Sequence, residues 1–141
     1  MAYTVKQQRE NVAKLVARLR DPATSQGRGA LRCGDSFCCL GVACDINDAS
    51  KWTDDDGSFM WSDGNSGGLV TESAREPYGL RTHVGGFNAR GCDVALAVMR
   101  RIRSGNFDTC LAELNDLGAT FAEIADVIEA HPPGLFTWEK S

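Results

Sequence analysis

The 141-residue sequence lacks the segments that carry proteins into or across membranes. No stretch approaches the roughly 18 consecutive apolar residues of a membrane span, and the first residues contain no apolar core of the kind found in secretory signals. An excess of positive charge is missing too, because the formal net charge is −4 and the pI is about 5.1. We therefore expect a cytoplasmic protein with reduced thiols and no membrane partner, for which bulk nucleic acid is disfavoured.

The sequence also lacks the spacing of a zinc site, although it contains six cysteines. Four of them lie close together, but no pair has the C-x-x-C spacing: Cys33, Cys38, Cys39 and Cys44. Neighbouring residues of a strand point to opposite faces, and five residues along a helix separate two side chains by about 140°. Both geometries suit a chelate poorly, so we expect small core residues, no metal and no cofactor. Whether these four thiols ever hold a metal stays open.

Nucleotide-binding and calcium-binding signatures are absent as well. The chain contains neither G-x-x-x-x-G-K-[ST] nor G-x-G-x-x-G, the two glycine-rich patterns that bind phosphate. The acidic residues 54–56 before Gly57 do not fit an EF-hand, because the first and last ligand positions would be Trp52 and Asp63. We interpret this acidic segment as a solvated turn.

Helical periodicity is clearest near the two ends of the chain. Residues 5–20 place apolar side chains at helical spacing behind Thr4, which begins a capping-box sequence. The same pattern follows Thr120, and His131 with the two prolines after it ends the helix. The sequence thus predicts a long first helix and a shorter last one.

The elements between these helices are shorter, and together they predict one α+β domain over residues 1–141, with several helices packed on a small antiparallel sheet or hairpin. The expected elements are a hairpin around Gly34, a helix from Cys39 to about Ile46, a second hairpin with residues 59–61 in one strand, a helix after Thr71, a glycine-rich loop over 81–92, a helix over 94–103 stopped by Gly105, and a helix over 109–116.

What the sequence does have is a dense segment, residues 26–45, with four cysteines, two arginines and four glycines. It allows three interpretations: a metal site, a nucleophile site, or a tight corner of the core beside an anion-binding loop. As a nucleophile, Cys39 would need a base, and His83 in the glycine-rich loop is the candidate. Surface positions for the histidines are the simpler interpretation, so Cys39 and His83 are weak catalytic candidates.

The anion-binding interpretation is the most economical for the start of this segment. Gly27 and Gly29 let backbone N–H groups approach a ligand, and Arg28 and Arg32 add guanidinium donors that bind phosphate through two hydrogen bonds. The sequence therefore predicts an anion site at this loop.

Four more residues complete the predicted ligand site. Trp52 or Trp61 would stack on a base, although core packing is the simpler explanation of such aromatic residues. Asn115 and Asp116 are further ligand-binding candidates, although a structural turn ending at Gly118 also explains them.

The charges are unevenly distributed along the chain. Residues 1–32 carry seven Lys and Arg against two acids, and residues 81–105 carry five against one. If these two basic blocks met in space, they would form an anion-binding surface on an acidic protein. The alternative is that both are ordinary solvated helix faces.

Three segments of the sequence together resemble one protein family. They are QGRGALR at 26–32, CCLGVACD at 38–45 and LNDLGATFAEIADVIE at 114–129. The combination is similar to a family of small, mostly uncharacterised proteins of tailed bacteriophages and prophages, whose members show QGxGxLR, CCLGVxCD and LNDxGxSFxxIAdxIE behind a leading amphipathic helix. This chain departs from the pattern at Ala43, around Pro77 and in the long loop over 81–92.

The resemblance implies a protein made by a virus in the cytoplasm of a bacterial host. Small accessory phage proteins manipulate the host, including by binding or degrading nucleotide signals of antiviral defence. We therefore expect a homo-oligomeric protein that sequesters a small phosphate-bearing ligand, such as a nucleotide-derived immune signal. Two alternatives stay open: an enzyme that cleaves or modifies such a nucleotide, and an adaptor that blocks a host protein through its acidic middle segment.

Overall fold

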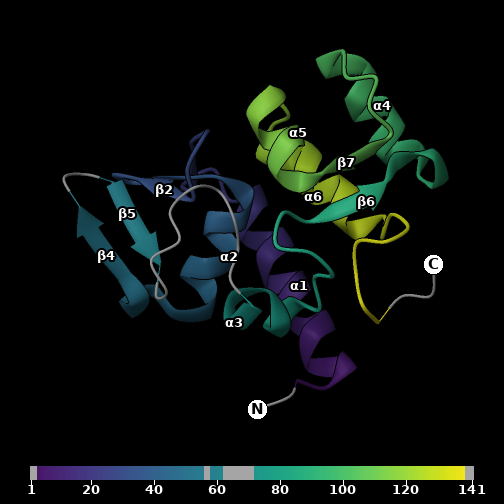
Figure 1. Cartoon of the computed structure of the whole chain (residues 1–141). Helices are drawn as coiled ribbons and strands as arrows, with labels where there is room; N and C mark the ends of the chain where they lie inside the picture. Colours follow the sequence, from purple (N-terminus) through teal and green to yellow (C-terminus); the bar gives the residue numbers. More distant parts are fainter. Residues whose placement is uncertain (1–2, 56–57, 62–71, 139–141) are drawn as a thin grey trace.

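The long first helix, α1 (Val5–Arg20), lies between the two halves of the chain in the view of Figure 1 and has one exposed face. It begins as predicted: the hydroxyl of Thr4 accepts from the N–H of Gln7, and the Gln7 side chain accepts from the N–H of Thr4. The buried residues of its apolar stripe are Val12, Leu15, Val16 and Leu19. The computed structural model describes residues 3–55, 58–61 and 72–138.

A five-stranded sheet forms from the first half of the chain, in the order β1-β3-β2-β5-β4. Both predicted hairpins are confirmed, the one that turns at Gly34 and the one that contains residues 59–61. The sheet is mixed rather than purely antiparallel, because β1 pairs with β3 in parallel. The strands are β1 (Ser25–Gln26), β2 (Arg32–Cys33), β3 (Ser36–Phe37), β4 (Trp52–Asp55) and β5 (Ser58–Trp61).

The helix α2 (Cys39–Asp48) packs against α1 and starts at Cys39, as predicted. Gly41 in its first turn lies directly on the backbone of Leu31, since a Cβ at this position would be 1.8 Å from the Leu31 carbonyl oxygen. This glycine therefore permits close packing of α2 on residue 31. A 3-10 turn, η1 (Ala49–Lys51), connects α2 to β4.

The second half of the chain wraps around the other side of α1 and contributes a two-stranded antiparallel sheet (Figure 1). The last helix is capped by Thr120 through the predicted capping box. The elements of this half of the chain are α3 (Glu72–Arg75), η2 (Glu76–Tyr78), β6 (Gly86–Asn88), η3 (Ala89–Gly91), α4 (Asp93–Ile102), β7 (Asp108–Cys110), α5 (Leu111–Leu117) and α6 (Phe121–Glu129).

Three expectations for this half were wrong. Residues 109 and 110 were expected in a helix over 109–116, but they lie in β7, and α5 begins at Leu111. Residues 81–92 are not all loop, because Phe87 in β6 pairs with Thr109 in β7. Gly105 does not terminate α4; Arg103 does, with the left-handed backbone angle φ of 61°. Non-glycine residues adopt this conformation at some cost, and here Arg103 N–H and Ser104 N–H both bond to carbonyls of the last turn.

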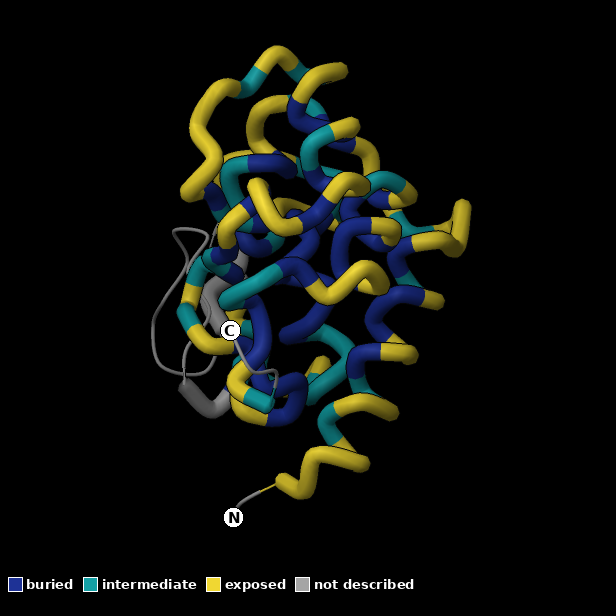
Figure 2. The backbone as a smooth tube through the Cα atoms, turned by 90° about the vertical axis from the view of Figure 1, so that its right-hand side faces the viewer, coloured by how far each residue is buried: buried dark blue, intermediate teal, exposed yellow. Residues whose placement is uncertain are grey.

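The helices and sheets share one hydrophobic core, which gives the predicted α+β class. Figure 2 shows the buried backbone gathered in the interior and the exposed turns around it. Within the described residues, no helix is long and apolar enough to span a membrane. Gly57, Asp63 and Thr71, which entered the sequence interpretation, fall outside the described residues, as does the side chain of Trp61.

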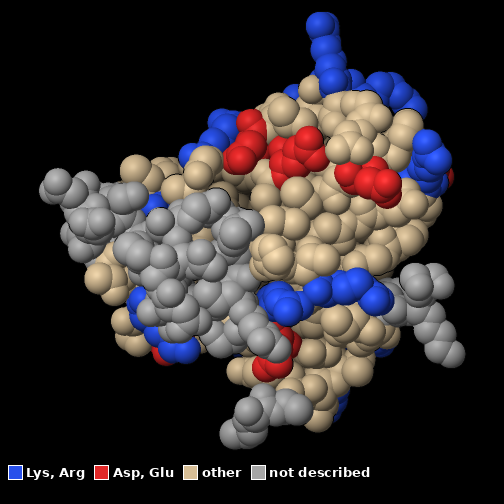
Figure 3. Space-filling model, in the orientation of Figure 1, with Lys and Arg blue, Asp and Glu red and all other residues tan. Residues whose placement is uncertain are grey.

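The two basic blocks of the chain both meet acids of α6. This helix packs against both α1 and α4. Arg20 of α1 pairs with Asp126 at 2.6 Å and with Glu129 at 2.5 Å, while Arg101 of α4 pairs with Glu123. On the face drawn in Figure 3, acidic side chains lie between the basic ones near α4 and those lower down. The acids of α6 therefore pair with one arginine of each basic block.

Candidate functional site

Asn115 is buried with no exposed surface and connects the three motif segments by hydrogen bonds. Its Oδ1 accepts from Gln26 Nε2 at 3.0 Å and from the backbone N–H of Cys39 at 3.3 Å. Its Nδ2 donates to the carbonyl of Gly27 at 2.8 Å. A buried amide costs little when its donors and acceptors are paired, so Asn115 stabilises the contact between the loop, α2 and α5.

The neighbours of Asn115 extend this junction. Gln26 also donates to the carbonyl of Ala119 at 2.8 Å and accepts from the N–H of Phe121 at 3.2 Å. Arg28 Nε donates to the carbonyl of Asn115 at 3.0 Å, and Asp116 Oδ1 accepts from the N–H of Gly29 at 3.0 Å. The QGRG and LND segments are thus parts of one hydrogen-bonded unit.

This junction corrects part of the predicted anion site. The N–H of Gly27 donates to the carbonyl of Phe37 at 2.7 Å, and that of Gly29 to Asp116, so both backbone donors are already bonded inside the protein. Asn115 is inaccessible to a ligand. Of the loop residues, Arg28 still offers donors: its side chain is exposed, and within the described part of the chain only its Nε has a partner.

Arg32 and Trp52 are brought together in a second cluster. The Arg32 guanidinium lies 5.2 Å from the ring centre of Phe37 and 5.6 Å from that of Trp52, and its Nε donates to the carbonyl of Gly34. Trp52 Nε1 donates to Asp45 at 2.9 Å. Trp61 faces Trp52 across the β4–β5 ladder by its backbone register. Asp45 also pairs with an arginine of α1, Arg18, at 2.8 Å.

The cysteines mainly fill the core, as the spacing predicted, with Cys33 as the exposed exception. Cys38 caps α2 by accepting from the N–H of Gly41, and Cys39 Sγ donates to the carbonyl of Leu111. Burial raises the pKa of Cys39 well above its usual range despite its place at a helix N-terminus. An activated nucleophile needs the opposite shift, and His83 lies exposed. The burial and raised pKa of Cys39 therefore argue against its role as an activated nucleophile.

These buried thiols predict a loss of stability in alkali. Burial raises the pKa of Cys38 from 9.0 to about 11 and that of Cys44 to about 12. Above pH 9 the unfolded chain releases these protons while the folded chain keeps them, so the free energy of unfolding should fall as the pH rises from about 9 to about 11. Urea unfolding midpoints across this window check the slope; a midpoint independent of pH would contradict the burial of these thiols.

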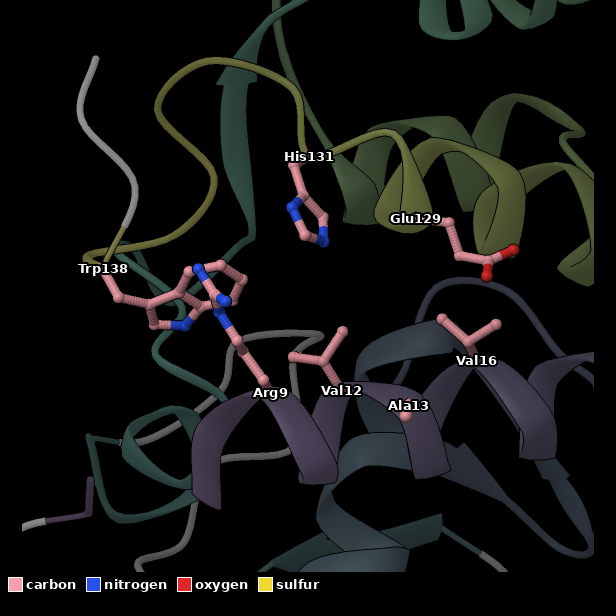
Figure 4. Close-up of a pocket in the computed structure, with 7 residues that line it drawn as sticks. All are labelled: Arg9, Val12, Ala13, Val16, Glu129, His131 and Trp138. Carbon is pink, nitrogen blue, oxygen red and sulfur yellow. The ribbon is translucent and has the colours of Figure 1, made fainter. Parts of the chain in front are cut away.

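A groove of about 380 Å³ lies between α1 and the segment that follows α6 (Figure 4). Val12, Ala13 and Val16 of α1 line its apolar floor. Its size falls in the range of small-molecule sites, which combine an apolar lining with a few polar groups. We take this groove as the candidate functional site.

The groove has polar and aromatic walls. At one end the Arg9 guanidinium lies 4.9 Å from the ring centre of Trp138, and at the other end stands Glu129 (Figure 4). His131 projects between them and packs edge-on against Trp138, with ring centres 5.2 Å apart. Trp138 is fixed in place, because its Nε1 donates to the carbonyl of Tyr78 at 3.2 Å.

Glycine at position 79 makes this wall possible. A Cβ at Gly79 would lie 2.3 Å from the Trp138 ring, and the φ angle of 70° also favours glycine. The groove was not predicted from the sequence, because His131 was interpreted only as the end of a helix. The available signal was the spacing of Arg9, Ala13 and Val16, which places them on one face of a helix.

Comparison with known proteins places the chain in a family. No curated protein and no solved structure was found to match it. Residues 6–132 match the family described as a domain of unknown function, DUF8296. This match covers α1, the Asn115 junction and most of the groove, whereas Trp138 lies beyond its last residue. The chain therefore belongs to the DUF8296 family.

Proposed function

We propose that the protein binds a small phosphate-bearing, nucleotide-like ligand in the groove and holds it without converting it. The observation that carries this proposal is Arg9 laid across Trp138 at the end of an apolar groove. A nucleotide needs an apolar surface against which its base can pack and a cation for its phosphate, and the groove supplies both. The ligand class is the one expected from the sequence, but its main contacts move from the loop to the groove.

Arg9 is suited to a phosphate contact by its surroundings. Its side chain is exposed, and no carboxylate pairs with it among the described residues. The indole of Trp138 holds the guanidinium by a cation–π contact without occupying its N–H donors. A pre-positioned guanidinium can bind a phosphate through two parallel hydrogen bonds.

Binding is favoured over conversion by the chemistry of the lining. Among the described residues, the groove is lined by one imidazole, one carboxylate and one guanidinium, but by no thiol or hydroxyl that could act as a nucleophile. The resemblance to small phage proteins supports the further proposal that the ligand is a nucleotide-derived immune signal of a bacterial host. Such sequestration would make the protein an anti-defence protein, acting as a homo-oligomer in the host cytoplasm.

Arg28 is the alternative binding position for the phosphate. Its Nε is anchored on the carbonyl of Asn115 at 3.0 Å, which fixes the direction of its remaining donors. Arg32 beside Trp52 would then supply the second cation and the stacking ring. This arrangement lacks an apolar bed at Arg28 itself, because Asp116 and Gly29 are its exposed neighbours. The groove is the stronger candidate for this reason.

Replacing Arg9 with alanine is expected to weaken nucleotide binding about 10- to 100-fold, since a charged hydrogen bond contributes about 1.5–3 kcal/mol. Calorimetric titration with a panel of mononucleotides and cyclic nucleotides measures the change. Arg28→Ala is the matched control, an exposed arginine outside the groove, and should bind like the wild type. Weakening by Arg28→Ala alone would move the site to the loop, and no binding of any panel member by the wild type would remove the proposal.

The fate of the ligand separates sequestration from catalysis. A bound nucleotide released by heating the complex should be recovered intact, as chromatography of the supernatant would show. Recovery of a cleaved or modified nucleotide would instead support the enzymatic alternative.

A further inference from the structure

The groove has opposite charges at its two ends. Arg9 stands at one end and Glu129 at the other, with the apolar face of α1 between them (Figure 4). The floor runs along α1 from Arg9 to Val16, which is about 10 Å at 1.5 Å per residue. A ligand that fits this polarity is anionic at one end, flat and apolar in the middle, and a hydrogen-bond donor at the other end.

We propose that the groove selects nucleotides whose base carries an exocyclic amine. The phosphate lies at Arg9, the base lies between His131 and the apolar face of α1, and the amine donates to the carboxylate of Glu129. This inference rests on the proposed function and adds the class of base and its orientation. A purine of the adenine type meets all three requirements, whereas hypoxanthine presents a carbonyl oxygen in place of the amine.

The position of Glu129 allows its carboxylate to accept a hydrogen bond from the base. Its Oε1 pairs with Arg20 at 2.5 Å, and Arg20 is itself held by Asp126 at 2.6 Å. This pairing restricts the Glu129 side chain while it remains half exposed toward the groove. A carboxylate accepts hydrogen bonds and has none to donate. It therefore favours an amine, disfavours a carbonyl oxygen, and keeps the phosphate at the opposite end.

The imidazole of His131 would pack on the side of the base opposite α1. The backbone of His131 has a φ angle of 50°, which few non-glycine residues adopt. The imidazole lies edge-on to two rings, 5.2 Å from Trp138 and 5.4 Å from Phe136, so its plane is set by packing. Unusual backbone angles at a ligand groove are typical of positions where the surrounding structure fixes a side chain.

The test compares adenosine 5′-monophosphate with inosine 5′-monophosphate, in which a carbonyl oxygen replaces the amine and N1 carries a hydrogen. The wild type should bind the adenosine nucleotide at least tenfold more tightly, because the amine is the donor that reaches Glu129. Glu129→Gln should lose most of this preference, because its neutral amide accepts from the amine more weakly than a carboxylate does and can also donate to the inosine carbonyl. Asp126→Asn is the control: it alters the other carboxylate that holds Arg20, lies outside the groove lining, and should keep the wild-type preference.

The outcomes separate this inference from the proposed function. Equal binding of both nucleotides by the wild type and by Glu129→Gln would overturn the amine selectivity and leave nucleotide binding in place. A loss of preference in Asp126→Asn as large as in Glu129→Gln would assign the effect to Arg20 and also overturn the inference. Binding of neither nucleotide by the wild type would remove the amine selectivity, and the panel titration would then decide the proposed function.

Discussion

Asn115→Ala should lower the free energy of unfolding by about 3 kcal/mol, because it removes three hydrogen bonds of a buried side chain to two other segments, the loop at residues 26–27 and the start of α2. The part-buried carbonyl of Gly27 and the buried N–H of Cys39 would both lose their side-chain partner. Leaving a buried polar group unpaired costs about 1–3 kcal/mol. Urea unfolding followed by circular dichroism measures the change.

Two further variants test this explanation. Asn115→Asp keeps the size of the side chain and one acceptor oxygen but places a carboxylate oxygen against the carbonyl of Gly27, so it should be at least as harmful as alanine. Leu117→Ala in the same helix removes a side chain that is 48% exposed and should change stability little. A loss of less than about 0.5 kcal/mol in Asn115→Ala would show that the junction does not stabilise the fold.

Gly41→Ala should be comparably destabilising, by about 3 kcal/mol. Alanine improves helix propensity by about 1 kcal/mol over glycine, but here the new Cβ would lie 1.8 Å from the Leu31 carbonyl oxygen and 2.7 Å from its carbon. The obstacle is backbone, so no side-chain rotation relieves it, and α2 must move away from residue 31. The steric cost therefore exceeds the gain in propensity.

The control for this substitution is Gly105→Ala. A Cβ at Gly105 would meet nothing within 4 Å, and its φ angle is not in the left-handed region. We expect the stability of this variant to be unchanged or slightly increased, because alanine restricts the unfolded chain. A Gly41→Ala protein with wild-type thermal stability would contradict the close packing of α2 on Leu31.

The parts of the fold that the sequence predicted are those determined by local interactions. Thr4 with Gln7, and Thr120 with Glu123, form capping boxes whose partners are three residues apart, and Gly34 closes a hairpin between adjacent strands. The same holds for the core cysteines, whose spacing argued against a chelate. Such features depend on neighbours along the chain and can be derived without the rest of the structure.

The remaining features depend on pairs that are far apart in the sequence. Asn115 and Gly27 are 88 residues apart, so a buried amide that joins two motifs resembled an ordinary turn residue. The groove likewise combines Arg9 of α1 with His131 and Trp138 from the end of the described chain. No local pattern indicates which distant segment will face α1. For the same reason, residues with a structural role were assigned to the predicted anion site.

The most direct test of ligand binding in the groove is an NMR titration of the tryptophan indole N–H signals with adenosine 5′-monophosphate. Trp138→Phe assigns the Trp138 signal, and Trp52→Phe assigns that of Trp52 at the competing cluster. Ligand binding in the groove should produce a saturable shift of the Trp138 indole signal, which is lost in Arg9→Ala, while the Trp52 signal stays in place. A shift at Trp52 with Trp138 unmoved would contradict binding in the groove.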